Sequence, residues 1–283
     1  MKGIAQLGAL HHFWMQGDLS HESITHYAGT SVGSLISLLL VCGYTPYEIW
    51  NEIYDADSLL TLQPRSPIST VFSSFGLMAV DGAIGKVKHL LEARFPSNPT
   101  LAELRELTGK TLVVAVTNFT HRQIEYCSYL DTPTLSCLDA VRASCAIPGL
   151  FRKVEINGSV YLDGALLDNF PLSAVDNGTS PLLGISLTAQ NVTGDGFFEF
   201  LRTIWSLPID ALTTQSIQRC GTNCRIVELE TKSVSPLKFV LEPEIRRRLF
   251  VSGFKNVSQI KEEQFLTIPG YTPRPQRVKS TVN

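Results

Sequence analysis

The sequence predicts an α/β fold with a mainly parallel sheet, and three stretches carry that prediction. Residues 24–28 form a short strand-like run, the motif Gly29–Gly33 follows, and the apolar run 35–41 then predicts a buried helix. Residues 111–116 are an almost continuous run of β-branched side chains, and residues 182–187 form another buried apolar run. Strands of this kind are typical of parallel sheets that helices cover on both faces.

Size and composition suit a single globular α/β domain and argue against other classes. The chain has 283 residues, of which 44% are hydrophobic and 18% are charged, so it can bury a sizeable core. A net charge of −2, without a basic stripe among aromatics, argues against a nucleic-acid binder. The six cysteines lack the paired spacing of a metal site, so we expect buried thiols in a reducing compartment. Without an internal repeat or a long linker, we expect one domain over residues 1–268.

Helical periodicity and capping residues predict several helices in the first part of the chain. Apolar residues recur at helical spacing over residues 3–15, which indicates an amphipathic helix. Capping boxes predict further helix starts at Thr45–Glu48 and at Thr100–Glu103. Asp81 is expected to cap a helix over residues 82–94.

Beyond residue 120, the pattern again alternates between strands and helices. Strands are expected at residues 123–129 and 225–229, and helices at residues 138–145, 197–214 and 242–254. The helix over residues 197–214 contains Pro208, so we expect it to be broken there. The helix over residues 242–254 carries Arg246, Arg247 and Arg248. Three consecutive arginines usually form a solvated face, although they could also meet anionic lipid headgroups.

Two stretches have no clean periodicity. Residues 58–79 are rich in Leu, Phe, Ser and Pro, which fits either an irregular packed loop or the wall of an apolar site. Prolines and a low apolar content predict a mobile tail over residues 269–283. The N-terminus lacks the apolar core of a signal peptide, and no window reaches the roughly 20 apolar residues that cross a bilayer. We therefore expect a cytoplasmic protein without a transmembrane segment.

The chemistry is expected at Ser31. A strand, the motif Gly-x-Ser-x-Gly and a helix, in that order, are the context of a nucleophile elbow, formed here by Gly29, Thr30, Val32 and Gly33 around the serine. The turn is so tight that Gly29 and Gly33 are expected to leave room for the backbone. The Ser31 hydroxyl then lies at the positive end of the following helix. The plain alternative is a Gly/Ser turn that caps a buried helix, because five-residue patterns also occur by chance.

A β-hairpin is expected to deliver Asp163 to the end of a strand. Asn157-Gly158 lies between two alternating runs, which is the strongest short-range signal of a hairpin. The returning strand ends at Asp163-Gly164-Ala165, and active-site groups of α/β proteins usually lie at strand ends. Asp-Gly is normally just a turn, but here it follows a strand rather than joining two, which favours a functional carboxylate.

The order of the residues along the chain decides which serine chemistry is possible. A serine hydroxyl is a weak nucleophile until a base takes its proton, and α/β-hydrolases place their histidine after the acid. All six histidines precede Asp163, so a triad in that order is impossible. His26 is expected to pack in the sheet and His121 lies on a turn; either could be recruited in space, but nothing in the sequence requires it. The simpler inference is a Ser31–Asp163 dyad in which the carboxylate is the direct base.

Together, the serine and aspartate motifs resemble the patatin-like phospholipases, a family that uses a Ser-Asp dyad. Residues 143–151 are similar to the family's segment upstream of its catalytic aspartate. Residues 168–171 and 237–253 resemble segments that follow it. The resemblance covers nearly the whole chain and implies a three-layer α/β/α sandwich.

The same resemblance implies an activity and a set of site residues. Ser31 would be the nucleophile and Asp163 the base, with Gly164 and Ala165 completing the aspartate motif. The reaction would be hydrolysis of lipid acyl esters through an acyl-enzyme, without a metal or another cofactor. The substrate would be a lipid, met at a membrane surface by a peripherally bound protein.

One departure from the family pattern concerns the oxyanion hole. The family opens with a strand and a glycine-rich loop, Gly-Gly-Gly-x-Arg/Lys-Gly, whose amides stabilise the oxyanion. Only Lys2 and Gly3 match this loop, and the leading glycines would lie before Met1. Removing one oxyanion donor typically costs about 100- to 1000-fold in rate. The Val32 amide, just after the nucleophile, is expected to remain a donor. The sequence thus favours either a chain with a missing start or an enzyme that hydrolyses esters poorly.

A second function stays open beside the enzyme, namely a lipid-binding or scaffold protein that keeps the fold but has lost turnover. Labelling of Ser31 by a fluorophosphonate separates the two. Nucleotide binding is a weaker hypothesis. It fails because no glycine loop is followed by the Lys-Ser/Thr of a P-loop and no Gly-x-Gly-x-x-Gly is present.

Overall fold

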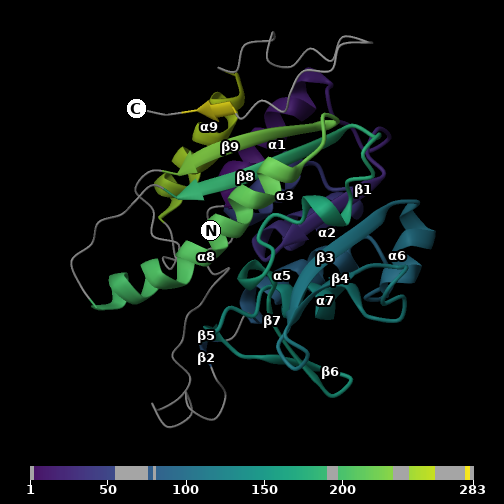
Figure 1. Cartoon of the computed structure of the whole chain (residues 1–283). Coiled ribbons are helices and arrows are strands. Elements are labelled where there is room, and N and C mark those ends of the chain that lie inside the picture. Colours follow the sequence, from purple (N-terminus) through teal and green to yellow (C-terminus); the bar gives the residue numbers. More distant parts are fainter. Residues whose placement is uncertain are drawn as a thin grey trace. The chain divides into compact units, whose positions relative to one another are not determined.

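The computed structural model describes residues 3–54, 76–78, 81–189, 197–231, 242–258 and 278–280 (Figure 1). The chain separates into two units, each assembled from discontinuous segments. The elbow unit comprises residues 21–44 and 56–174, and the terminal unit comprises residues 1–20, 45–55 and 175–283. A single domain over residues 1–268 stays a prediction from the sequence.

The elbow unit is built on a sheet whose central strand is β3 (Thr111–Asn118). Every residue of β3 is buried, as its β-branched composition predicts. β3 pairs in parallel with β1 (His26–Thr30) and antiparallel with both β4 (Gln123–Cys127) and β7 (Ser159–Asp163). β6 (Val154–Ile156) extends the sheet beyond β7. β1 pairs with residues 111–115 of β3 and β7 with residues 116–118, and β4 overlaps both registers. The elbow strand and the aspartate strand therefore meet end to end on one edge of β3, and β4 occupies the other edge.

Helices α2 (Val32–Val41) and α7 (Cys137–Ser144) pack against this sheet. α2 contacts β1 and β3, whereas α7 contacts β3 and β7. α5 (Asp81–Glu92) packs against both helices. The most buried face of α2 carries leucines, such as Leu38 with 0% exposure, which explains the apolar run in the sequence.

Smaller elements complete the elbow unit. They are the helix α6 (Leu101–Thr108), the parallel pair β2 (Gly76–Met78) and β5 (Gly149–Phe151), and the 3₁₀ turns η1 (Gly164–Leu166) and η2 (Leu172–Ala174). α6 starts at the predicted capping box, in which Thr100 accepts a hydrogen bond from the Glu103 amide and Glu103 accepts one from the Thr100 amide. The predicted hairpin is also confirmed, since Asn157 and Gly158 join β6 to β7 with φ values of 51° and 80°.

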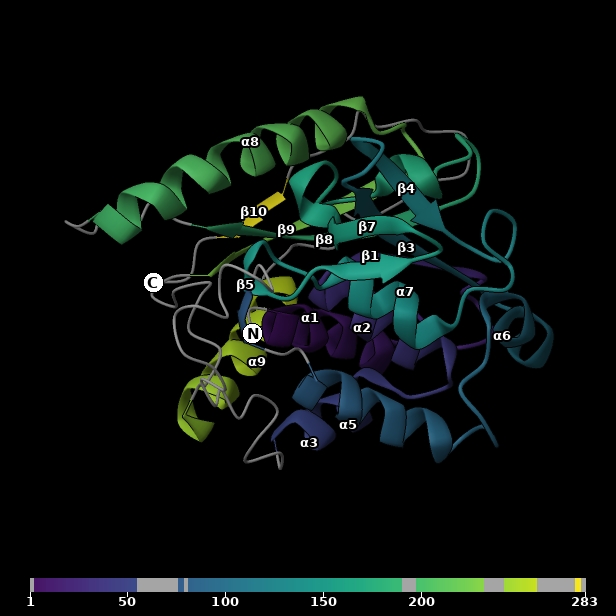
Figure 2. The same cartoon turned by 90° about the horizontal axis from the view of Figure 1, so that it is seen from below.

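The terminal unit has three layers (Figure 2). Its sheet contains β8 (Leu182–Ala189), β9 (Cys224–Thr231) and β10 (Val278–Ser280), all parallel, in the order β10-β9-β8. α8 (Phe197–Arg219) covers one face. The other face is covered by α1 (Gly3–Gln16) and α9 (Pro243–Ser258), and α3 (Pro46–Tyr54) packs beside these two helices. The predicted α/β fold with mainly parallel pairing is confirmed.

Two glycines bring the backbones of α1 and α9 into direct contact. A Cβ atom added to Gly8 would collide with the carbonyl oxygen of Phe250, and one added to Gly253 would collide with the carbonyl oxygen of Ala5. Only glycine allows such an approach at these positions. α1 and α9 therefore pack backbone against backbone, although they are far apart in the sequence.

The structure corrects the expected break at Pro208. α8 runs without interruption from Phe197 to Arg219. Proline removes the helical partner of the carbonyl group four residues earlier, at Ile204. Ile204 is 48% exposed, so water can bond to that carbonyl and the helix can continue.

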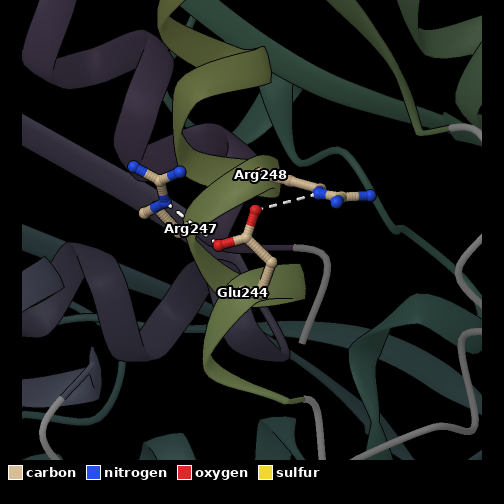
Figure 3. A network of polar contacts seen from close by, with 3 residues as sticks. All are labelled: Glu244, Arg247 and Arg248. Atoms are coloured by element: carbon tan, nitrogen blue, oxygen red, sulfur yellow. Dashed lines mark hydrogen bonds and ion pairs between the residues drawn. The ribbon is translucent and has the colours of Figure 1, made fainter.

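The arginine run of α9 divides between two faces of the helix. Arg246 is buried on the face that also carries Leu249 and Phe250, so the expectation of a fully solvated run is wrong for this residue. Arg247 and Arg248 are exposed, and both donate through Nε to the carboxylate of Glu244, at 3.2 and 3.1 Å (Figure 3). Exposed pairs of this kind contribute little to stability, typically below about 1 kcal/mol.

Two sequence hypotheses fall mostly outside the described residues. Of the irregular stretch 58–79, only β2 is described, and its pairing with β5 was not expected. Of the predicted mobile tail 269–283, only β10 is described, in parallel pairing with β9. No single helix in the described part of the chain is long and apolar enough to cross a membrane.

Candidate active site

Ser31 occupies the turn between β1 and α2 in a strained backbone conformation. Its φ and ψ angles are 53° and −125°, a region that residues other than glycine rarely adopt. Such conformations cost about 1–3 kcal/mol and cluster at functional sites. Ser31 holds the N-cap position of α2, yet its side chain makes no capping hydrogen bond. The hydroxyl is therefore left for other partners at the positive end of the helix.

The two motif glycines have different roles. A Cβ atom added to Gly29 would collide with the backbone of Gly33 and with the amide nitrogen of Ser34, so the elbow can close only around a glycine there. A Cβ atom added to Gly33 would meet nothing within 4 Å. The prediction that both glycines leave room for the backbone is thus right for Gly29 and wrong for Gly33.

β3 brings Asp163 to the elbow. Thr30, the last residue of β1, pairs with Ala115, and Asp163, the last residue of β7, pairs with the adjacent Val116. The Ser31 hydroxyl lies close enough to the Asp163 carboxyl group to lower its pKa. The two side chains that the sequence selected separately are therefore in contact.

The Asp163 carboxyl group is almost completely buried, with 1% of the residue exposed. Burial raises the pKa of Asp163 to about 6, against the opposing effects of the hydrogen bonds with Ser31 and with the Ala165 amide. That amide donates to Oδ1 at 2.8 Å. A carboxyl group with this pKa is largely ionised at neutral pH and is a better proton acceptor than an exposed aspartate.

Gly164 and Ala165 position the carboxyl group from the other side. A Cβ atom added to Gly164 would collide with the carbonyl group of Ala115, so η1 can lie against β3 only with glycine there. η1 begins directly after Asp163, which caps this turn through the bond from Ala165. In the aspartate motif, Gly164 thus lets η1 lie close to β3, and the Asp163 side chain caps η1.

A second aspartate, Asp168, supports the elbow and was not identified as a support from the sequence. Its carbonyl oxygen accepts a hydrogen bond from the Thr30 hydroxyl at 2.9 Å, and its Oδ2 accepts one from the Tyr126 hydroxyl at 2.7 Å. Burial raises the pKa of Asp168, while the bond from Tyr126 lowers it. Burial likewise raises the pKa of Tyr126 to about 12, so its hydroxyl stays protonated and can donate. The residue before the nucleophile is therefore anchored to the loop after η1.

Ser144, the last residue of α7, also contacts the nucleophile. Its Oγ accepts a hydrogen bond from the Ser31 amide at 2.8 Å. The sequence placed Ser144 in a family-like segment but gave no role to its hydroxyl. The next residue, Cys145, has a buried thiol, and burial raises its pKa while Ser34 and Ser31 lower it.

Neither candidate histidine lies beside the serine. His26 is exposed at the start of β1, so the expectation that it packs in the sheet is wrong. Four strand residues lie between it and Ser31, so five steps along the strand, roughly 16 Å, separate the two. The ring of His121 forms a hydrogen bond with the Asn118 side chain in the turn after β3. Within the described ranges, no group of three or more His, Cys, Asp or Glu side chains could hold a metal ion.

The expected oxyanion residues are only partly in the elbow unit. Val32 is the first residue of α2, so its amide belongs to the helix terminus that follows the serine. Gly3 is the first residue of α1 in the terminal unit, and Lys2 lies outside the described residues. The elbow unit by itself therefore offers the Val32 amide as the donor next to Ser31.

The sequence has relatives among viral and plant proteins. It is 31% identical over 174 residues to a protein of Invertebrate iridescent virus 6 named "Probable lipid hydrolase 463L", a match that covers 61% of this chain and 59% of that protein. It is 26% identical over 270 residues to an uncharacterized protein of Acanthamoeba polyphaga mimivirus, covering 91% and 89% of the two. The triacylglycerol lipase SDP1L of Arabidopsis thaliana is 28% identical over 162 residues, which are 55% of this chain and 20% of the lipase.

Two solved structures share the fold. VipD from Legionella pneumophila superposes with a TM-score of 0.51 and 20% identity, over 91% of this chain and 64% of VipD. The type III effector ExoU superposes with a TM-score of 0.53 and 15% identity, over 94% of this chain and 51% of ExoU. The chain therefore spans less than two thirds of either structure, and of the iridescent virus relative.

A family model settles the relationship. The model described as patatin-like phospholipase matches residues 1–176, which is more than half of the chain and includes Ser31 and Asp163. Homologues named as a lipid hydrolase and a triacylglycerol lipase agree with it. The chain belongs to the patatin-like phospholipase family.

Proposed function

We propose that this protein hydrolyses carboxylic ester bonds of acyl lipids, with Ser31 as the nucleophile and Asp163 as the base. The observation that carries the proposal is the proximity of the strained serine to the buried aspartate, whose pKa the serine hydroxyl lowers. A hydroxyl at a helix N-terminus, beside a carboxylate whose pKa is about 6, is suited to proton transfer at neutral pH. Membership of a lipid hydrolase family supports a lipid ester as the substrate.

The reaction would proceed in two halves. In the first, Asp163 takes the proton of the Ser31 hydroxyl while Oγ attacks the acyl carbonyl carbon. The tetrahedral oxyanion then collapses, the ester C–O bond breaks, and the alcohol leaves with the proton from Asp163. In the second half, Asp163 takes a proton from water, the hydroxide attacks the acyl-serine, and Ser31 leaves with that proton as the fatty acid is released.

The oxyanion would be stabilised at the start of α2. The Val32 amide and the positive end of the helix face the position where charge develops in an elbow of this kind. A hole with few donors would give slow turnover, since each donor contributes about 100- to 1000-fold. We expect turnover of phospholipids or related acyl lipids at a membrane surface, by a cytoplasmic protein that binds there peripherally.

The deciding experiment labels Ser31 with a fluorophosphonate and compares wild type with Ser31→Ala on phospholipid, lysophospholipid and triglyceride vesicles. The proposal expects labelling at Ser31 and loss of fatty-acid release in the variant. Ser37→Ala is the matched control, because it removes a hydroxyl from α2 that bonds to Ala28 rather than to Asp163. A folded wild type that is neither labelled nor active would reject the enzyme. Vesicle binding by that inactive protein would then favour the lipid-binding alternative.

A further inference from the structure

Ser144 is completely buried and joins the nucleophile to the central strand. Its Oγ accepts a hydrogen bond from the Ser31 amide at 2.8 Å and donates one to the Ala115 carbonyl oxygen at 2.7 Å. An amide can only donate and a carbonyl oxygen can only accept, so the orientation of the hydroxyl proton is fixed. The hydroxyl therefore has one arrangement, in which its lone pair points at the serine backbone.

The Ser31 amide lies where the sheet no longer supplies a partner. Parallel pairing between β1 and β3 ends with Thr30 opposite Ala115, one residue before the nucleophile. A buried amide without an acceptor is costly, and the positive φ of Ser31 adds strain at the same residue. Ser144 replaces the missing sheet partner with a side-chain acceptor and so holds this strained conformation.

The same segment also holds the base. Two residues after Ser144, the carbonyl oxygen of Ala146 accepts a hydrogen bond from the Asp163 amide at 2.9 Å. The segment Ser144–Ala146 thus bonds to the backbone of the serine at one end and to the backbone of the aspartate at the other. The separation of their side chains depends on this short segment.

We infer that Ser144 is a positioning residue, which fixes the backbone of Ser31 so that its hydroxyl stays against Asp163. The inference rests on the proposed function and adds to it a residue that does not itself touch substrate. Without the Ser144 hydroxyl, the elbow would relax and the oxygen would spend less time at bonding distance from the carboxylate. Misplacement by about 1 Å can cost about 100-fold in rate.

A matched pair of variants separates positioning from a loss of stability. Ser144→Ala removes the bridge to Ser31. Ser37→Ala removes another buried serine hydroxyl, which donates to the Ala28 carbonyl oxygen at 3.0 Å rather than to a residue of the dyad. With a soluble short-chain ester, we expect Ser144→Ala to lower kcat by about 10- to 100-fold with KM within about twofold. Ser37→Ala should keep kcat within about twofold at a comparable loss of Tm. Ser144→Thr, which keeps the hydroxyl oxygen, should restore most of the rate.

Hydrogen exchange of the wild-type protein tests the role of Ser144 without any variant. If Ser144 accepts the Ser31 amide, that amide is protected from hydrogen exchange in the folded protein, although it lies outside both β1 and α2. An unprotected Ser31 amide would overturn the inference even if Ser144→Ala failed to fold. A kcat of Ser144→Ala within twofold of wild type would overturn it as well, while the proposed function would stand. A wild type that fluorophosphonate does not label would reject the proposed function itself, and the inference with it.

Discussion

The Ser31 hydroxyl lies close enough to the Asp163 carboxyl group to lower its pKa, because β1 and β7 pair with consecutive stretches of the same edge of β3. Their backbones are held by separate contacts, to Ser144 in one case and to Ala146 in the other. The serine is strained and the aspartate is buried, and both conditions oppose stability. A single substitution can remove either the strain at Ser31 or the buried charge of Asp163. Measurements of stability, as well as of activity, can therefore test the site.

The pH dependence of turnover should report Asp163. Its pKa of about 6 means that the base is protonated, and unable to accept a proton, below that pH. We expect kcat on a soluble ester to rise with pH through an apparent pKa near 6 and then to level off. Asp163→Asn should lower kcat by about 100- to 10,000-fold at every pH. Residual turnover above a tenth of wild type in a folded Asp163→Asn protein would contradict the role of the base.

Asp163 should also make stability depend on pH, with a sign opposite to that of most carboxylates. The folded pKa of about 6 lies above the ordinary value of 3.8, so the folded state binds the proton more tightly than the unfolded state. The stabilisation that protonated Asp163 contributes is therefore fully present below about pH 4 and is lost as pH rises through about 6. At neutral pH the loss amounts to about 3 kcal/mol, at 1.36 kcal/mol per pKa unit.

Replacing the charge should recover this loss. Asp163→Asn keeps an acceptor for the Ala165 amide, so we expect its Tm to exceed that of wild type at pH 7.5 but not at pH 4.5. Asp139→Asn is the control, because the Asp139 side chain is 48% exposed and pairs with Arg142. Thermal unfolding followed by circular dichroism gives the comparison. A Tm of Asp163→Asn below wild type at pH 7.5 would show that burial of the charge is not the dominant cost.

The two motif glycines should respond differently to alanine. Gly29→Ala places a methyl group against the backbone of Gly33, and over-packing of this kind costs about 1–3 kcal/mol. Gly33→Ala places its methyl group in open space inside α2, so stability should stay the same or rise by up to about 1 kcal/mol. Urea unfolding of both variants measures the difference. Equal losses would mean that Gly33 is needed for a reason other than space.

Substitutions at Ser31 should reveal the strain directly. Ser31→Gly and Ser31→Ala both remove the hydroxyl, but only glycine adopts a φ of 53° without cost. We expect the glycine variant to be more stable than the alanine variant by about 1 kcal/mol. Glu106 lies at an exposed position of α6, where glycine is a poor helix former. There we expect the alanine variant to be more stable than the glycine variant by about 1 kcal/mol. Denaturant unfolding of the four variants provides the test, and the same order at both positions would argue against strain at Ser31.

The sequence predicted those parts of the site that depend on local pattern. The elbow follows from a strand, a five-residue motif and a helix in succession, and the hairpin that carries Asp163 follows from Asn157-Gly158. The order of the histidines then pointed to a dyad, and the structure brings Ser31 and Asp163 together. Each of these inferences used residues that are neighbours in the chain or a simple order along it.

The supporting contacts could not be predicted because they join distant residues across packed surfaces. The bond from Ser31 to Ser144 spans 113 positions, and the bond from Tyr126 to Asp168 spans 42. Both depend on which face of a helix or strand rests on the sheet. The different roles of Gly29 and Gly33 likewise depend on how closely α2 returns over β1, which a motif does not encode.

The close contact between α1 and α9 has a consequence for biosynthesis. The helix that meets α1 at Gly8 and Gly253 begins about 230 residues after α1 ends. At a synthesis rate of about 5–20 residues per second, α9 is therefore made roughly 10–50 s after α1. In that interval the part of α1 that packs against α9 lacks this partner on the nascent chain. Chaperone capture of ribosome-bound chains at α1 should therefore persist until α9 has emerged.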